Sequence, residues 1–95
     1  MIERLVDVFC EMVKIDSESG HEEAFLEYLS DLFARNLNAD CALDSYGNLI
    51  ARVAAKNCER ELPVLFGCHG DTVKPGRGIE PVIADGVIRS RGDTV

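Results

Sequence analysis

The sequence predicts an α/β fold in which two amino-terminal helices pack on a mixed sheet that contains two hairpins. Three observations predict it. Two early stretches repeat apolar residues at helical spacing, the pattern then changes to short apolar runs, and turn-forming pairs separate those runs. The order helix, helix, hairpin, buried strand, hairpin is typical of a sheet layered with helices. A chain of 95 residues has room for one small core, so by its length it would be a single domain of modest stability.

Two amphipathic helices are expected before residue 40. In the first, Ile2–Val13, apolar residues recur at spacings of three and four with charged residues between them. The second is expected to start at Ser19 and Glu22, whose S-x-x-E spacing is that of a capping box. It should end near residues 36–38, where asparagine tolerates the conformation of a C-terminal cap. Its expected buried face consists of Ala24, Phe25, Tyr28, Leu29, Leu32 and Phe33.

Two hairpins are expected in the rest of the chain. Gly47 and Asn48 supply the turn of the first, and the Asp85-Gly86 pair supplies the turn of the second. The paired runs are 41–44 with 48–53, and 81–84 with 87–90. Between the hairpins, Val64–Cys68 is almost wholly apolar, which predicts a central strand covered on both faces.

The charge balance argues against several classes of protein. Ten Lys and Arg residues stand against 17 Asp and Glu, a formal charge of −7, and the basic residues are scattered. Neutralising phosphates needs clustered basic residues, so no nucleic-acid partner is expected. Charged residues among the first twelve argue against a secretory signal, and no apolar run approaches the ~20 residues that span a bilayer. We therefore expect a cytoplasmic protein without a membrane partner.

The four cysteines show no C-x-x-C spacing and no secretory context, so thiols are expected rather than a disulfide framework. Cys10 lies on the apolar stripe of the first helix and Cys68 ends the expected central strand, and buried cysteine behaves as a small apolar residue. Cys68 is not expected to act as a nucleophile with His69, because neighbours in a strand point to opposite faces.

His69 and Asp71 are the strongest candidates for a functional site. Both residue types bind divalent metals, and residues i and i+2 of an extended segment point to the same side. They follow the expected strand Val64–Cys68, and ligands of open α/β sheets gather beyond the carboxyl ends of strands. By itself the His-x-Asp spacing predicts a metal site only weakly, because these residues also serve as ordinary caps and turns.

Two other candidates have simpler interpretations. His21 lies among glutamates in the first turn of the second expected helix, and it is more simply a surface residue than a ligand. The Pro75–Gly78 loop with Arg77 could hold an anion, but its glycines and proline are more simply explained as turn formers.

The sequence around His69 resembles a known family. Residues Leu65–Ile79 are similar to the first metal-site motif of peptidase T-like dizinc metallopeptidases. The wider superfamily includes acetylornithine deacetylase and succinyl-diaminopimelate desuccinylase. Further stretches agree in order and spacing, so that the resemblance covers nearly the whole chain: Val13–Ser17 with Ser19–Glu22, Asp44–Leu49, and Asp85-Gly86 with Gly92.

The resemblance implies a fold, a reaction and roles for two residues. His69 would be a ligand of one of two Zn²⁺ ions, and Asp71 would be the catalytic-site carboxylate that orients the site without binding metal. In complete enzymes the zinc ions activate a bridging water and a glutamate acts as general base. The implied fold is the first part of a three-layer α/β/α catalytic domain. The implied reaction is hydrolysis of a short peptide by a tripeptidase or aminopeptidase or, alternatively, deacylation of an N-acyl amino acid.

The sequence ends before the next motif of that family. Gly-Ala-Asp-Asp-Lys supplies the bridging carboxylate and would follow Val95, whereas Asp93 aligns before it and does not replace it. Residues 1–95 are thus expected to be the amino-terminal portion of a metallopeptidase catalytic domain, truncated before the bridging-Asp motif. One matched ligand falls short of the three of a catalytic zinc, so no activity is expected from this portion by itself. The alternative is a non-catalytic scaffold that binds a partner through exposed apolar surface or a sheet edge.

Overall fold

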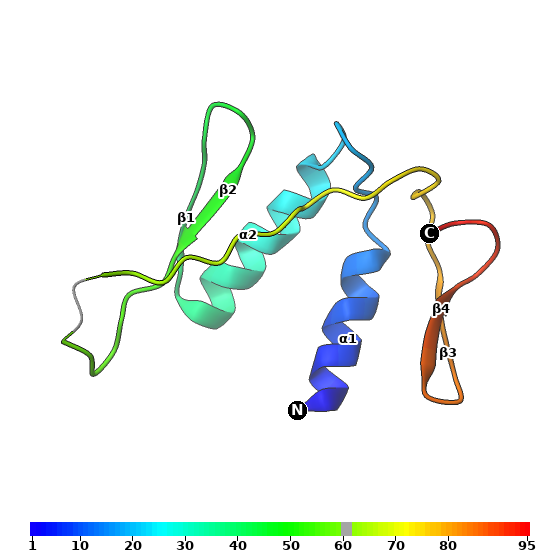
Figure 1. The fold of residues 1–95 in the computed structure, drawn as a ribbon, viewed down its shortest axis with the longest axis horizontal. Coiled ribbons are helices and arrows are strands. Elements are labelled where there is room, and N and C mark those ends of the chain that lie inside the picture. The colour runs from blue at the N-terminus through cyan, green and yellow to red at the C-terminus, as the bar shows by residue number, and fades with distance from the viewer. Residues whose placement is uncertain (60–61) are drawn as a thin grey trace. The chain divides into compact units, whose positions relative to one another are not determined.

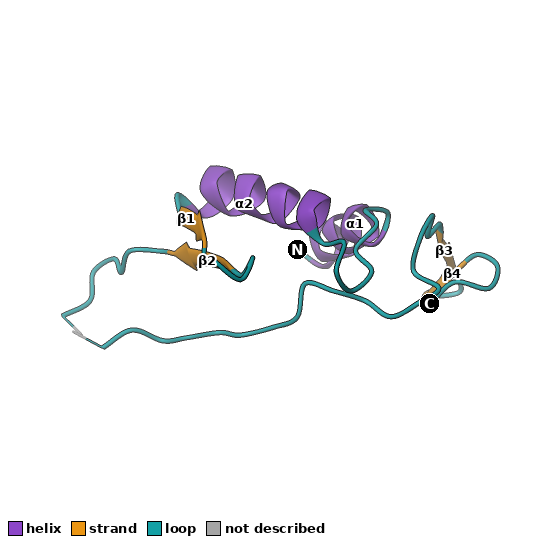
Figure 2. Ribbon diagram, turned by 90° about the horizontal axis from the view of Figure 1, so that it is seen from above, coloured by secondary structure: helices purple, strands orange, loops and turns teal. Residues whose placement is uncertain are grey.

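The computed structural model describes residues 1–59 and 62–95, which contain two helices and two hairpins (Figures 1 and 2). The α/β class is therefore confirmed. The chain divides into two compact units. The first comprises Met1–Phe25 and Gly70–Val95, and the second comprises Leu26–His69.

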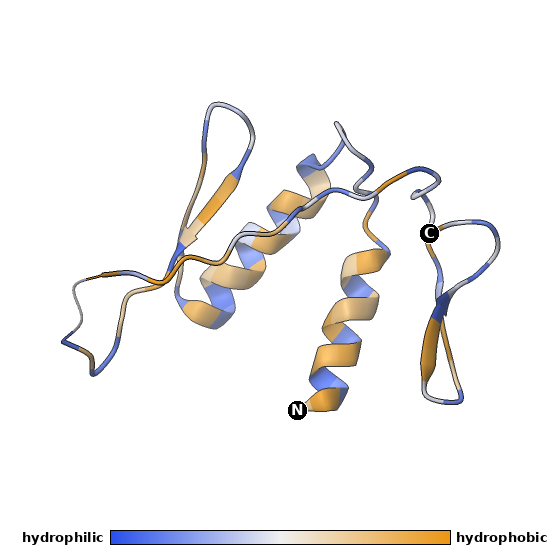
Figure 3. Ribbon diagram, in the orientation of Figure 1, coloured by the Kyte–Doolittle hydropathy of each residue, from blue (hydrophilic) through white to orange (hydrophobic). Residues whose placement is uncertain are grey.

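The first helix, α1 (Ile2–Val13), has the bounds that its apolar spacing predicts. Apolar and polar bands alternate along it in Figure 3. The second helix, α2, runs over Glu23–Leu37 and ends where predicted, since Asn38 adopts the left-handed conformation at φ 50°. None of its residues is fully buried, and Ala24 of the predicted buried face is exposed. No helix in the described ranges has the length and apolar character that crossing a bilayer requires.

The predicted capping box at the start of α2 is wrong. The Ser19 hydroxyl donates to Asp71 Oδ2 at 2.6 Å, and the Glu22 carboxylate accepts from the Gly20 amide at 2.8 Å. In a capping box the Ser19 hydroxyl oxygen would accept from the Glu22 amide and the Glu22 carboxylate from the Ser19 amide. Here the hydroxyl is directed at Asp71 and the carboxylate at Gly20. The helix consequently starts at Glu23, and His21 lies before it as an exposed residue.

Both predicted hairpins are confirmed. Strands β1 (Asp40–Leu43) and β2 (Leu49–Arg52) pair antiparallel, as do β3 (Pro81–Ala84) and β4 (Val87–Ser90). In the second hairpin Asp85 and Gly86 have φ of 52° and 73°. A two-residue turn of this kind needs a positive φ at both positions, which is why Asp-Gly predicts it.

Asp44 organises the turn of the first hairpin. One carboxylate oxygen accepts from the amides of Tyr46 and Asn48, and the other accepts from the Asn48 side chain, each at 2.9 Å. These hydrogen bonds, led by that from the Asn48 side chain, hold the pKa of Asp44 below its usual value. The left-handed Gly47 completes the turn at φ 84°. Within the second unit β1 also contacts α2, since the Cys41 thiol lies 3.6 Å from the Ser30 carbonyl oxygen.

The predicted mixed sheet and its central strand are wrong for the described residues. The four strands pair within their hairpins, as two separate two-stranded antiparallel sheets. Val64–Cys68 forms no strand, and the side chains of Leu65 and Phe66 are 91% and 90% exposed. A strand needs a neighbour to satisfy its backbone N–H and C=O groups, and none of the described strands pairs with this segment. Cys68, expected to be buried at its end, is exposed.

Many large apolar side chains are exposed in the described residues. Among the described residues, no apolar side chain is fully buried. The exposed large side chains include Ile2, Leu5 and Phe9 of α1, and Val64, Leu65 and Phe66. Figure 3 shows apolar segments, coloured orange, on both helices, on the strands and in the connecting chain. The single small core suggested by the chain length is therefore not present in the described residues.

Candidate functional site

His69 and Asp71, the two residues that the sequence singles out, belong to different units. His69 is the last residue of the second unit, and Asp71 is the second residue of the segment Gly70–Val95 in the first. Both are exposed. The described residues contain no group of three or more His, Cys, Asp and Glu that could hold a metal ion. The side chains of residues 1–59 and 62–95 therefore do not make up a complete zinc centre, for which three protein ligands are usual.

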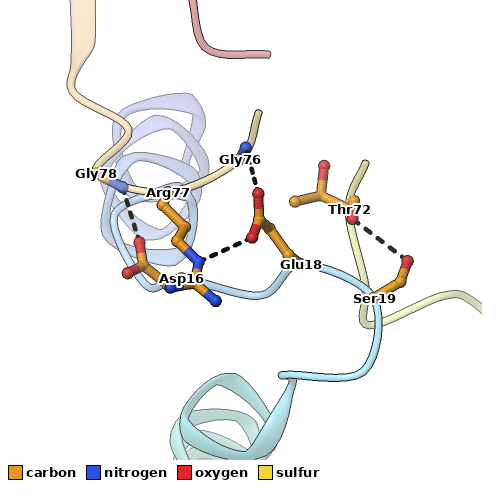
Figure 4. Close-up of polar contacts among 7 residues, drawn as sticks. All are labelled: Asp16, Glu18, Ser19, Thr72, Gly76, Arg77 and Gly78. Atoms are coloured by element: carbon orange, nitrogen blue, oxygen red, sulfur yellow. Dashed lines mark hydrogen bonds and ion pairs between the residues drawn. The ribbon is translucent and has the colours of Figure 1, made fainter. Parts of the chain in front are cut away.

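The first unit brings together two segments that are far apart in the sequence, Asp16–Ser19 and Gly70–Gly78, which we call the clasp (Figure 4). The Thr72 amide donates to the Ser17 carbonyl at 2.8 Å, and the Ser19 amide donates to the Thr72 carbonyl at 3.1 Å. These two bonds form a parallel bridge between Glu18 and Thr72. The backbone next to Asp71 is thus fixed by hydrogen bonds to residues more than fifty positions earlier.

Glu18 is the buried centre of the clasp. Its side chain is 7% exposed; Oε2 accepts from the Gly76 amide at 3.1 Å and Oε1 accepts from Arg77 Nε at 2.8 Å. The Gly76 hydrogen bond first, and then the Arg77 guanidinium, hold the pKa of Glu18 below its usual value. A buried carboxylate needs partners of this kind, and Glu18 has them in one short loop.

A second carboxylate fixes the same loop. Asp16 Oδ1 accepts from the Gly78 amide at 2.8 Å, and Gly78 has a positive φ of 63° (Figure 4). The Arg77 guanidinium pairs with Glu18, which supports the interpretation of Pro75–Gly78 as a shaped turn over that of an anion site.

Gly76 is buried where the loop passes closest to its neighbours. A Cβ atom at this position would lie 2.7 Å from Thr72 Cγ2 and 2.7 Å from the Val73 carbonyl oxygen. Contacts of this length are closer than carbon atoms tolerate. The amide of the same residue reaches Glu18, so glycine allows both the close approach and the hydrogen bond.

Two serines hold the residues around Asp71. The Ser17 hydroxyl donates to the Gly70 carbonyl, and the Ser19 hydroxyl donates to Asp71 Oδ2 at 2.6 Å. The sequence pattern assigned Ser19 to a helix cap, and the roles of Ser17, Glu18 and Ser19 in the clasp were missed. The available signal was the family resemblance, since two of its matched stretches supply the two sides of the clasp.

We expect the clasp to weaken in acid because of Glu18. Its pKa is lowered by folding, so its carboxylate stabilises the clasp fully above its ordinary pKa of 4.5. This contribution is lost as the pH falls through the lower folded-state pKa. In Glu18→Gln the protection of the Gly76 amide from hydrogen exchange should be lower at neutral pH and should no longer decrease on acidification. Protection factors measured by NMR between pH 7 and pH 3 test this expectation.

Glu80→Gln is the matched control for this experiment. Glu80 also pairs with an arginine, at 3.1 Å from Arg91 Nε, but both side chains are about 70% exposed. Exposed ion pairs are screened by water and contribute little. In Glu80→Gln the protection of the Gly76 amide from hydrogen exchange should therefore depend on pH as it does in the wild type. An identical acid profile in Glu18→Gln and the wild type would show that another group is responsible.

Comparison with known proteins finds one relative that covers almost the whole chain. No family model matches the chain, and no solved structure matches it. The relative is a protein of Bacillus subtilis (strain 168) that is described as uncharacterized protein YqjE, and the chain is 34% identical to it over 100 residues. The match covers 97% of the chain but 26% of the Bacillus protein, so the chain spans about a quarter of the length of this relative.

Proposed function

We propose that the chain is the amino-terminal portion of a zinc-dependent exopeptidase of the peptidase T-like type. The complete enzyme would hydrolyse short peptides near their amino end in the cytoplasm. The observation that carries the proposal is the ordered resemblance of four stretches to that family. The clasp supports it, because two of these stretches, around Ser17–Ser19 and around Asp71–Gly78, contact each other in the first unit.

Two further observations support a role within a longer protein. The Bacillus relative is about four times as long as the part matched, since the match covers 26% of it. The apolar side chains of Leu65 and Phe66, and of Ile2, Leu5 and Phe9 in α1, are exposed in the described residues. Exposed apolar surface of this kind is typical of a site that contacts further protein.

The proposed zinc chemistry needs residues beyond those present. His69 would supply one imidazole ligand, and Asp71 would orient the site as a carboxylate neighbour. The remaining ligands and the general base have no matched residues in this sequence. We therefore propose that the 95-residue chain neither holds zinc tightly nor hydrolyses peptides by itself, and no catalytic step is assigned to it.

A chimera tests the proposed function. In it, the 95-residue chain replaces the matched 100 residues of the Bacillus protein, and the parent Bacillus protein and the isolated chain are assayed beside it. We expect the chimera and the parent to hydrolyse di- and tripeptides when zinc is supplied, and to lose activity when zinc is chelated. The isolated chain should show no hydrolysis, because a single ligand cannot complete a catalytic zinc site.

The substrates distinguish the alternatives. Hydrolysis of N-acyl amino acids with no hydrolysis of peptides would replace the peptidase by a deacylase of the same superfamily. A folded chimera and a folded parent that hydrolyse neither substrate class would contradict the enzymatic proposal and favour the non-catalytic scaffold. Substantial hydrolysis by the isolated chain would contradict its proposed incompleteness.

A further inference from the structure

The carboxylate of Asp71 is held by a residue from the other side of the clasp. The Ser19 hydroxyl donates to Asp71 Oδ2 at 2.6 Å, across 52 positions of sequence. An O–H donor and an ionised carboxylate form short, comparatively strong hydrogen bonds, and 2.6 Å lies within their usual range. Both residues belong to the first unit, so this contact is internal to one compact body.

The position of the Ser19 hydroxyl is itself determined by the clasp. The Ser19 amide donates to the Thr72 carbonyl at 3.1 Å, and the neighbouring Glu18 is anchored by Gly76 and Arg77. The hydroxyl oxygen also lies 3.4 Å from the same Thr72 carbonyl oxygen. The single hydroxyl proton favours the shorter contact with the charged Asp71 oxygen.

The hydroxyl is not needed for the backbone bridge. That bridge consists of amide and carbonyl groups of Ser17, Ser19 and Thr72, all of which remain when Ser19 loses its hydroxyl. Removing the hydroxyl should therefore change the orientation of the Asp71 side chain while the backbone of the segment that carries Asp71 stays folded.

We propose that Ser19 is a positioning residue for Asp71, which it holds in one side-chain rotamer through the hydrogen bond from its hydroxyl. The functional meaning of this rotamer rests on the proposed function, in which Asp71 orients the catalytic site. Ser19 touches neither substrate nor metal in this role and acts through the Asp71 carboxylate.

The test measures the Asp71 rotamer directly in the 95-residue chain. Three-bond couplings to the Asp71 carboxyl carbon report whether one χ1 rotamer dominates or several interconvert. We expect the wild type to show the couplings of one rotamer and Ser19→Ala to lose that pattern through averaging. Ser19→Thr keeps a hydroxyl and should restore the pattern. Ser45→Ala, which removes an exposed hydroxyl from the first hairpin turn, should leave it unchanged.

Hydrogen exchange at the Thr72 amide separates positioning from folding. This amide donates to the Ser17 carbonyl and should keep its protection in Ser19→Ala. Unchanged Asp71 couplings in Ser19→Ala would overturn the proposal. Loss of Thr72 protection in that variant would also overturn it, because Ser19 would then be needed for the clasp as a whole.

The coupling measurement needs neither zinc nor a peptide. A result that overturns the positioning role of Ser19 can therefore be told apart from one that contradicts the proposed function. In the chimera, Ser19→Ala should lower kcat/KM by about 10- to 100-fold, the usual cost of losing a group that supports a metal site. Rotamer averaging with unchanged kcat/KM in an active chimera would overturn the positioning role. If the folded unsubstituted chimera and the folded parent Bacillus protein were both inactive, the proposed function would be contradicted and the rotamer result would still stand.

Discussion

Replacement of His69 by alanine should lower the zinc-dependent kcat/KM of the chimera by about 100-fold or more. The proposed role of His69 is to bind zinc through its imidazole, and changes beside a metal site already cost about 10- to 100-fold. His69 is exposed, and substitutions at exposed positions usually change stability little, so the variant should fold. The loss should appear as lower zinc content of the purified protein as well as slower hydrolysis.

His21→Ala is the matched control, because the chain has two histidines and both are exposed. His21 lies between the clasp and α2, and no metal-binding role is proposed for it. Exposed substitutions usually change stability by less than about 0.5 kcal/mol, so activity should stay within about twofold. Equal losses in the two variants, or none in His69→Ala, would contradict the proposed ligand.

Gly76→Ala should open the clasp. The added Cβ would lie 2.7 Å from the Val73 carbonyl oxygen, a backbone atom, and 2.7 Å from Thr72 Cγ2. Relieving such overlap costs about 1–3 kcal/mol, which corresponds to roughly a 5- to 150-fold lower population of the closed form relative to the open one. Protection of the Thr72 amide from hydrogen exchange should fall by that factor, because this amide is bonded within the clasp.

Gly67→Ala supplies the matched control. A Cβ at Gly67 would meet no atom within 4 Å, and its φ lies outside the left-handed region. The same chemical change should therefore leave Thr72 protection as it is in the wild type. Wild-type protection in Gly76→Ala would show that the clasp adapts to the extra atom without cost.

The elements predicted well are those in which neighbouring residues decide the conformation. The spacing of apolar residues determines α1, Asn38 ends α2 through a left-handed conformation, and Asp85-Gly86 closes a two-residue turn. Each of these depends on contacts within a few residues. Local propensities are therefore sufficient to predict them.

The elements predicted wrongly depend on partners that sequence spacing does not identify. The apolar run Val64–Cys68 has strand composition, but strand formation needs a pairing neighbour that the described residues do not supply. Ser19 has the spacing of a capping residue, but its amide bonds to the Thr72 carbonyl and its hydroxyl to the Asp71 carboxylate. The local preference is overridden in both cases, by the lack of a pairing strand for Val64–Cys68 among the described residues and by the presence of a distant carboxylate for Ser19.

The sequence by itself determined the two helices, the two hairpins and the candidacy of His69 and Asp71, because periodicity, turn chemistry and an ordered motif can all be recognised along the chain. Only the tertiary structure decided that Glu18 meets Gly76 across 58 positions and that Ser19 meets Asp71 across 52. The physical reason is that a buried carboxylate and a hydroxyl take whichever partners folding brings within hydrogen-bond distance. Those partners carry no fixed spacing in the sequence.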